Sequence, residues 1–249
     1  MMDTWAITKR NLLRYIRLPQ LLFFSSIQPV IFLTLFNFVF GGALGQNSPY
    51  GAYINYLLPG IMIQTTLFGS LNTGIGLAED MGKGIIDRFR SLPLSRAAVM
   101  AGRTMSDMLR NVVVMAIMFI VGTIYGFRFM NGFLPAIMMF VTALIFSFSI
   151  SWVAAFVGLT VKDSETAQLA GFVFIFPLTF ASSAFVPVQY MPGWLQAFAN
   201  NQPVTHAVNA ARSFALGSPM NSAFWYLLAW VAGILLIFVP LSIWRYRKS

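Results

Sequence analysis

The sequence contains no cysteine and only one histidine, His206. Without cysteine the chain has no disulfide, no thiolate metal site and no cysteine nucleophile. His206 has no acidic residue close to it in the sequence, so the residues for a metal centre or a Ser-His-Asp catalytic set are missing. We therefore expect no catalytic residue, no bound metal and no cofactor in this chain.

Charge is also scarce, because only 9% of the 249 residues are charged, whereas about 25% is usual in a soluble domain. In contrast, 58% are hydrophobic and 25 are phenylalanine. One soluble core could not bury so much apolar surface, which predicts an all-α integral membrane protein. The formal net charge of +9 would suit nucleic acid, but the basic residues cluster at the ends of apolar segments, so no nucleic-acid partner is expected.

Six apolar segments are long enough to cross a bilayer, which takes about 20 residues. The predicted spans are residues 21–44, 53–77, 108–127, 133–160, 166–186 and 225–244. The second of these spans carries several polar residues and should be interrupted at Pro59-Gly60. No Asp, Glu, Lys or Arg lies in the centre of a predicted span, which disfavours an ion-coupled carrier.

Two further segments should lie at the membrane surface. Residues 3–17 place Trp5 and leucines on one side of a helix and arginines on the other, which predicts an interfacial amphipathic helix. The alternative is a basic flank that only sets orientation. Residues 187–219 are punctuated by proline, and their apolar pieces are too short to cross, which predicts outer or re-entrant short helices near 193–199 and 205–216.

The basic residues predict the orientation. With six spans, fourteen of the sixteen Lys and Arg residues and all seven acids fall on one side, and only Arg128 and Arg212 fall on the other. By the positive-inside rule that side is cytoplasmic, so both termini should be cytoplasmic.

The segment 79–103, which we call the island, holds eight of the 23 charged residues. Ser91-Leu92-Pro93 should break it into two short helices parallel to the membrane, with charges that steer a cytoplasmic partner and apolar side chains that anchor it. The alternative is a solvated loop whose charges only set topology.

Residues 76–84, GLAEDMGKG, have five residues rather than four before Gly-Lys and lack the following Ser or Thr, so they are not a nucleotide phosphate loop.

The island resembles the corresponding loop of type-2 ABC exporter permeases, in particular the daunorubicin-resistance branch. The resemblance rests on DRFRSLPLSR at 87–96 and AGRT at 101–104, and it extends to MPGWL at 191–195, Pro203-x-Thr205 and Arg212. The chain departs from that pattern at Asn201-Gln202-Pro203, where the family commonly has Asn-Pro.

The resemblance implies a single type-2 ABC transmembrane domain over residues 1–249 in a bacterial cell membrane. It implies pairing with a second or related permease copy, and two cytoplasmic ATPase subunits that bind ATP and Mg. The island would be the coupling helix, the cytoplasmic segment of the permease that contacts the ATPase. The implied coupling residues are Asp87, Arg88, Phe89, Arg90, Leu92, Pro93 and Arg96.

The implied cargo is a hydrophobic or amphipathic molecule, and drug, lipid and glycolipid remain open. Polar and aromatic residues of the first, second and fifth spans are candidates for its path, although each could equally serve interhelical packing. These candidates are Asn37, Gln64, Thr65, Asn72 and Phe172. The alternatives to an exporter subunit are an ion-coupled carrier or channel, and a membrane enzyme or assembly factor.

Overall fold

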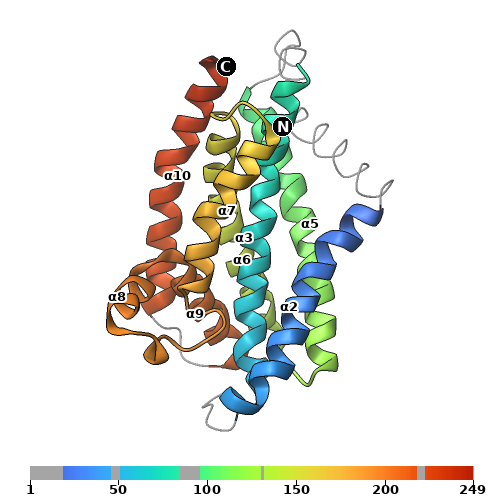
Figure 1. The fold of residues 1–249 in the computed structure, drawn as a ribbon, viewed down its shortest axis with the longest axis vertical. Coiled ribbons are helices and arrows are strands. Elements are labelled where there is room, and N and C mark those ends of the chain that lie inside the picture. Colours follow the sequence, from blue (N-terminus) through green and yellow to red (C-terminus); the bar gives the residue numbers. More distant parts are fainter. Residues whose placement is uncertain (1–18, 46–50, 85–95, 130–131, 218–221, 249) are drawn as a thin grey trace.

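The computed structural model describes residues 19–45, 51–84, 96–129, 132–217 and 222–248, and all regular elements within these ranges are helical (Figure 1). The elements are α2 (Pro19–Gly45), α3 (Tyr53–Gly82), α5 (Arg96–Ile124), α6 (Phe133–Gly158), α7 (Ser164–Phe180), the short 3-10 helix η1 (Val188–Tyr190), α8 (Gly193–Asn201), α9 (Pro203–Leu216) and α10 (Ser222–Lys248). The predicted all-α fold is confirmed.

Six long helices, α2, α3, α5, α6, α7 and α10, run along the longest axis of the molecule (Figure 1). The helix α3 lies at the centre and contacts α2, α5, α6, α7 and α9. We call the end where α3 finishes and α5 begins the island end, and the opposite end, where α8 and α9 lie, the α9 end. The helix α2 begins and α10 finishes at the island end.

The central position of α3 explains its polar composition. Its side chains are buried without a break from Tyr53 to Leu67, so its polar residues contact protein rather than lipid. The hydroxyl of Thr65 donates to the Ile61 carbonyl at 2.7 Å, which satisfies it within its own helix. A helix surrounded by other helices does not need an apolar surface on every side.

The helix α3 continues through Pro59 and Gly60, so the predicted interruption is wrong. Gly60 lies directly against the backbone of Ala184, where any side chain would collide. Gly74 makes an equally close backbone contact with Gly158 of α6. Small residues at these crossings let the helices approach closely, as in other membrane bundles.

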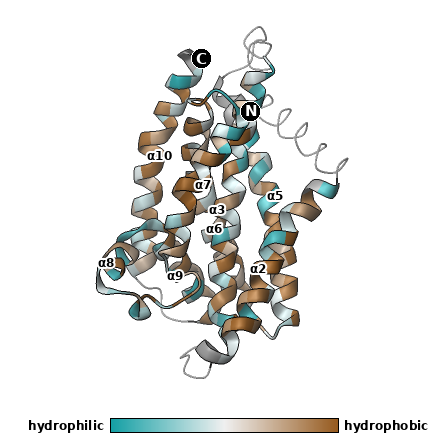
Figure 2. Cartoon of the chain, in the orientation of Figure 1, coloured by the Kyte–Doolittle hydropathy of each residue, from teal (hydrophilic) through white to brown (hydrophobic). Residues whose placement is uncertain are grey.

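Among the described helices, four are long and apolar enough to cross a membrane, within α2, α5, α6 and α10. Their outward surfaces are largely hydrophobic (Figure 2). The helix α7 has 17 residues and a length of about 26 Å, slightly less than the 30 Å hydrocarbon core. The chain is a multi-pass membrane protein, and the six-span topology stays a prediction.

Two helices have bounds that differ from those of the predicted spans, and the spans themselves stay a prediction. The third span was expected to begin at 108, and α5 already begins at Arg96, with Arg103 and Asp107 in contact with α3. The fifth span was expected to reach 186, but α7 ends at Phe180 and the chain turns over the next residues. There the hydroxyl of Ser182 donates to the Thr179 carbonyl and accepts from the Ala184 amide, which stabilises the turn.

The two short helices predicted after the fifth span are confirmed as α8 and α9. Gly217 ends α9 with φ of 75°, a left-handed conformation that glycine adopts without strain. At the start of α7, Asp163 accepts from the amide and the hydroxyl of Thr166, and these bonds lower the pKa of the Asp163 carboxyl. The predicted interfacial helix at 3–17 lies outside the described residues.

Candidate functional site

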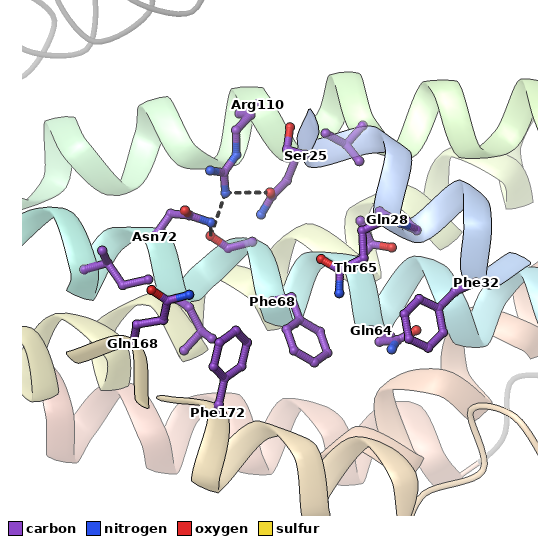
Figure 3. A pocket seen from close by; sticks show the side chains of 16 residues that line it. Ser25, Gln28, Phe32, Gln64, Thr65, Phe68, Asn72, Arg110, Gln168 and Phe172 are labelled. Atoms are coloured by element: carbon purple, nitrogen blue, oxygen red, sulfur yellow. Dashed lines mark hydrogen bonds between the residues drawn. The ribbon is translucent and has the colours of Figure 1, made fainter. Parts of the chain in front are cut away.

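A pocket of about 230 Å³ lies between α2, α3, α5 and α7 (Figure 3). The helix α3 forms its floor with Gln64, Thr65, Phe68 and Asn72, and the other three helices contribute side chains from around it. The pocket therefore lies against α3, the helix that contacts α2, α5, α6, α7 and α9.

The structure brings four of the five predicted path residues together in this pocket. Gln64, Thr65 and Asn72 line it from α3, and Phe172 lines it from α7. Asn37 does not join them, because it lines a second hollow together with Tyr53 and Tyr125. The pattern of α2 could not place Asn37, since the polar residues of this helix do not gather on one face.

A buried arginine, Arg110 of α5, lines the same pocket. One of its Nη atoms donates to the Gly69 carbonyl at 2.6 Å and to Oδ1 of the neighbouring Asn111 at 3.3 Å (Figure 3). The amide of Asn111 donates in turn to the Ser147 hydroxyl of α6 at 2.9 Å. Gly69 has no side chain, and Asn111 occupies the space where one would lie. The guanidinium is thus held beside α3 inside the membrane domain.

Aromatic rings line the pocket alongside these polar groups. Phe32 of α2, Phe68 of α3 and Phe172 of α7 contribute rings, and the centroids of Phe68 and Phe172 lie 6.1 Å apart. Phe68 also meets Phe176 edge to face at 5.5 Å. The pocket can therefore contact both an apolar body and a polar group of one molecule.

Sequence reasoning missed several lining residues. Arg110 was counted only as a charge that sets topology, and Gln28 and Gln168 were not considered. Arg110 carried one usable signal, because a cation directly before an apolar run can belong to the span itself. The amides gave no signal, since only the packing of α2 and α7 places them.

At the island end, α3 and α5 are joined by charged side chains. Arg103 forms an ion pair with Asp80, and its guanidinium crosses Gly76, where a side chain would collide with it. One turn further along α5, the Asp107 carboxylate accepts from the Thr73 hydroxyl at 2.6 Å. Contacts of this kind connect the two helices that flank the island.

Most predicted coupling residues cannot be placed. Asp87, Arg88, Phe89, Arg90, Leu92 and Pro93 lie outside the described residues, as does the predicted helix break. Arg96 is the first residue of α5. The base of the island is described, since Glu79 and Asp80 belong to the last turns of α3.

At the α9 end, Arg212 holds α9 against α3. Its guanidinium donates to the Tyr56 carbonyl at 3.1 and 3.2 Å and to the Ser183 carbonyl at 2.9 Å. It also lies 3.6 Å from the centre of the Tyr56 ring, a cation–π contact. Arg212 is only 5% exposed, so this outer arginine is an internal connector between α9, α3 and the turn after α7.

The single histidine does not belong to any metal cluster among the described residues. Its ring lies 5.1 Å from that of Tyr226 at the junction of α9 and α10. This contact packs α9 against α10.

Comparison with known families decides the identity. The ABC-2 type transporter model matches residues 2–216, most of the chain. The chain belongs to the ABC-2 type transporter family. It is similar to the daunorubicin resistance ABC transporter permease protein DrrB1 of Streptomyces coeruleorubidus, with 34% identity over 96% of this chain and 84% of the relative.

Two further relatives of the ABC-2 chain extend this result. The probable doxorubicin resistance ABC transporter permease protein DrrC of Mycobacterium tuberculosis is 30% identical over 99% of this chain and 89% of its own length. The putative transport permease ycf38 of Cyanophora paradoxa is 25% identical over 84% and 73% of the two chains. The resemblance found in the island and the outer segment is therefore confirmed over nearly the full length.

Proposed function

We propose that this chain is the transmembrane permease subunit of an ATP-driven ABC exporter, which moves a hydrophobic or amphipathic molecule out of the cytoplasm or the inner leaflet. Relatives that align over nearly all of its length are named as ABC transporter permeases. The observation that carries the proposal is the geometry of α3 and α5, which flank the island and also line the pocket.

In this proposal the island receives motion from the ATPase. Two cytoplasmic ATPase subunits bind ATP and Mg, and they contact the island through Asp87, Arg88, Phe89, Arg90, Leu92, Pro93 and Arg96. Their closure displaces the island, and because α3 and α5 are joined by the Asp80–Arg103 ion pair, the displacement moves both helices together. The shape of the pocket changes as a result.

The proposed topology has six spans with both termini in the cytoplasm of a bacterial cell. Residues 3–17 lie at the inner interface, and α8 and α9 lie near the outer surface. Two permease copies, identical or related, form the complete translocation path, with Gln64, Thr65, Asn72 and Phe172 facing the cargo.

Because the chain has no cysteine, single cysteines introduced at Gln46 and Ser91 test the orientation. Labelling of both by an impermeant reagent in intact cells contradicts it.

The test of function is co-purification of the permease with its ATPase, followed by ATPase assays in lipid nanodiscs. Cargo extracted with the complex should stimulate hydrolysis. Arg90→Glu and Leu92→Asp should leave assembly of the permease intact but abolish that stimulation, because they alter the proposed docking surface. Arg128→Glu, at an exposed residue after α5, is the matched control. Unchanged stimulation in both island variants contradicts the docking role.

A further inference from the structure

We propose that a groove between α6 and α7 binds one acyl chain of a membrane phospholipid, and that this chain supports α7 on the side away from the pocket of Figure 3. The groove is a separate cavity of about 380 Å³, lined by residues within 150–157 of α6 and 167–178 of α7. The central helix α3 and Phe238 of α10 complete the lining. The inference goes beyond the proposed export function, because it concerns a lipid that stays bound rather than the molecule that is carried.

The first argument is the chemistry of the lining. Among the described residues that line the groove, every side chain is apolar, and the remaining positions are glycine. The pocket of Figure 3 differs, because glutamine and asparagine side chains line it as well. The described lining of the groove offers no hydrogen-bonding side chain to a head group or a polar cargo, so it suits a hydrocarbon.

The second argument is the shape. The groove is lined at the spacing of one helical face by Ala167, Gly171, Phe174 and Leu178. It therefore follows α7 for about 16 Å, and a volume of about 380 Å³ over that length is narrow. A transmembrane helix of a second copy is about 10–12 Å wide and would fill roughly three times this volume over the same length. A single hydrocarbon chain is thin and flexible enough to enter.

The third argument is where the groove opens. Phe174, which lines it from α7, is 65% exposed. The neighbouring Leu169 and Val173 of α7 are also exposed and apolar. The lining residues of α6 and α10 lie within helices that are long and apolar enough to cross a membrane. The opening therefore faces the hydrocarbon of the bilayer, where phospholipid chains are the surrounding molecules.

The fourth argument is the position of α7 between two cavities. Its residues Gln168 and Phe172 line the pocket of Figure 3, whereas Gly171 lines the groove. Leu71 of α3 lines both cavities and lies directly against Gly171, where a side chain would collide with it. An empty groove would leave this side of α7 without packing partners, so a bound chain supports the wall of the pocket.

The test uses a phosphatidylcholine that carries a diazirine in the middle of one acyl chain. The full-length permease is loaded with this probe in detergent, diluted into probe-free micelles and irradiated, and the adducts are mapped by mass spectrometry. Probe on the outer surface is lost on dilution, whereas a chain in the groove is retained. The peptide with Val157 should keep at least about fivefold more adduct than the peptide with the exposed Phe23 and Phe24, since the groove surrounds the chain with contacts.

Two substitutions assign the retained adduct to the groove. Val153→Phe and Val157→Phe each add a ring at a half-buried residue of the lining. Each should lower the retained adduct on α7 at least about threefold, because the ring takes the space of the chain. Val173→Phe is the matched control, since it makes the same change at an exposed residue of α7 outside the groove. It should leave the adduct unchanged.

A second measurement tests the support of α7 on the unaltered chain. Adding phosphatidylcholine to the delipidated permease should slow hydrogen exchange of the α7 amides, relative to those of α9, at least about threefold, since a filled groove opposes local opening. Val157→Phe should show the slow exchange without added lipid. Exchange of α7 that does not respond to lipid in the unaltered chain would contradict its support by a bound chain.

The adducts can overturn the proposal in three ways. Loss of all adduct on dilution, or equal retention in the unaltered chain and both groove variants, would show that no chain occupies the groove. A loss in Val173→Phe equal to that in Val157→Phe would place the effect outside the groove. Disulfide formation between two copies with cysteines at Phe156 and Phe174 would show a second permease copy as the occupant. In each case the export function stands, because the probe is not tested as cargo.

Discussion

The two ends of α3 are held in different ways. At the α9 end, Gly60 lies against the backbone of Ala184, and the buried Arg212 binds the carbonyls of Tyr56 and Ser183. At the island end, Gly76 lies against the flexible side chain of Arg103, whose ion pair with Asp80 leaves the two side chains 16% and 20% exposed. The α9 end is fixed through backbone contacts, whereas beyond the backbone contact of Gly74 with Gly158 the last turns of α3 are held to α5 through movable side chains.

This difference indicates where α3 can move. Backbone contacts and buried hydrogen bonds to a charged group resist displacement, because breaking them leaves a buried charge without its acceptors. The Asp80–Arg103 ion pair joins two flexible side chains, which can change their rotamers and re-form the pair in a new position. We infer that the α9 end is a fixed support and that the island end transmits displacement to the pocket between them.

Gly60→Ala should have the largest effect on stability. Its methyl group would overlap the Ala184 backbone, which cannot move away without shifting the turn after α7. The expected loss is roughly 3 kcal/mol or more, the upper end of overpacking effects, and it is measured as a lower apparent melting temperature in detergent. Gly41→Ala is the control, because nothing lies near that position and alanine favours the helix. If the two variants were equally stable, the contact between Gly60 and the Ala184 backbone would not fix the α9 end of α3.

Arg212→Ala should have the second largest effect on stability. It leaves the Tyr56 and Ser183 carbonyls without their charged donor, with an expected loss of about 2 to 3 kcal/mol. Arg212→Lys should recover only part of the loss, since an ammonium lacks the planar fork that reaches both carbonyls. The melting temperature and hydrogen exchange of α9 measure both variants. If Arg212→Ala did not change the stability, α9 would be held by apolar packing alone.

Asp80→Ala should change stability less but change coupling more. We expect a loss of about 1 to 2 kcal/mol, between the values for exposed and for buried ion pairs, because Arg103 would lose its charged partner. In the complex, cargo-stimulated ATP hydrolysis should fall several-fold, because α3 and α5 no longer move together. Glu79→Ala removes the more exposed pair with Lys83 and is the matched control. Full stimulation in Asp80→Ala would show that this ion pair does not link the helices.

Asp163→Ala should have the smallest effect, confined to the first turn of α7. The pKa of Asp163 is lowered by the Thr166 bonds, so its contribution is complete above the ordinary aspartate pKa and disappears as the pH falls through the lowered one. Exchange of the first amides of α7 should be faster in Asp163→Ala at neutral pH, while Asp163→Asn keeps the cap. An unchanged exchange rate would exclude a capping role.

The sequence predicted the helical class and the two short helices, because apolar length and proline positions determine them directly. Four of the predicted path residues line one pocket, and their role in a cargo path stays a prediction. Sequence reasoning failed where tertiary contacts decide. The interruption at Pro59-Gly60 was wrong, since close packing on Ala184 is not visible in hydropathy. The continuity of α5 from the island into the predicted third span was also not visible there, because it involves the pairing of Arg103 with α3. Asn37 was misplaced because α2 has no polar face to orient it.

The most direct test of the fixed and the movable end is a pair of distance measurements in the assembled complex. Spin labels on cysteines at Lys83 and Glu165 report the island end, and labels at Phe133 and Trp194 report the α9 end, where all four residues are exposed. Trapping the ATPase with ATP should shift the first distance by several ångströms and leave the second unchanged. A shift confined to the α9 end would contradict the account.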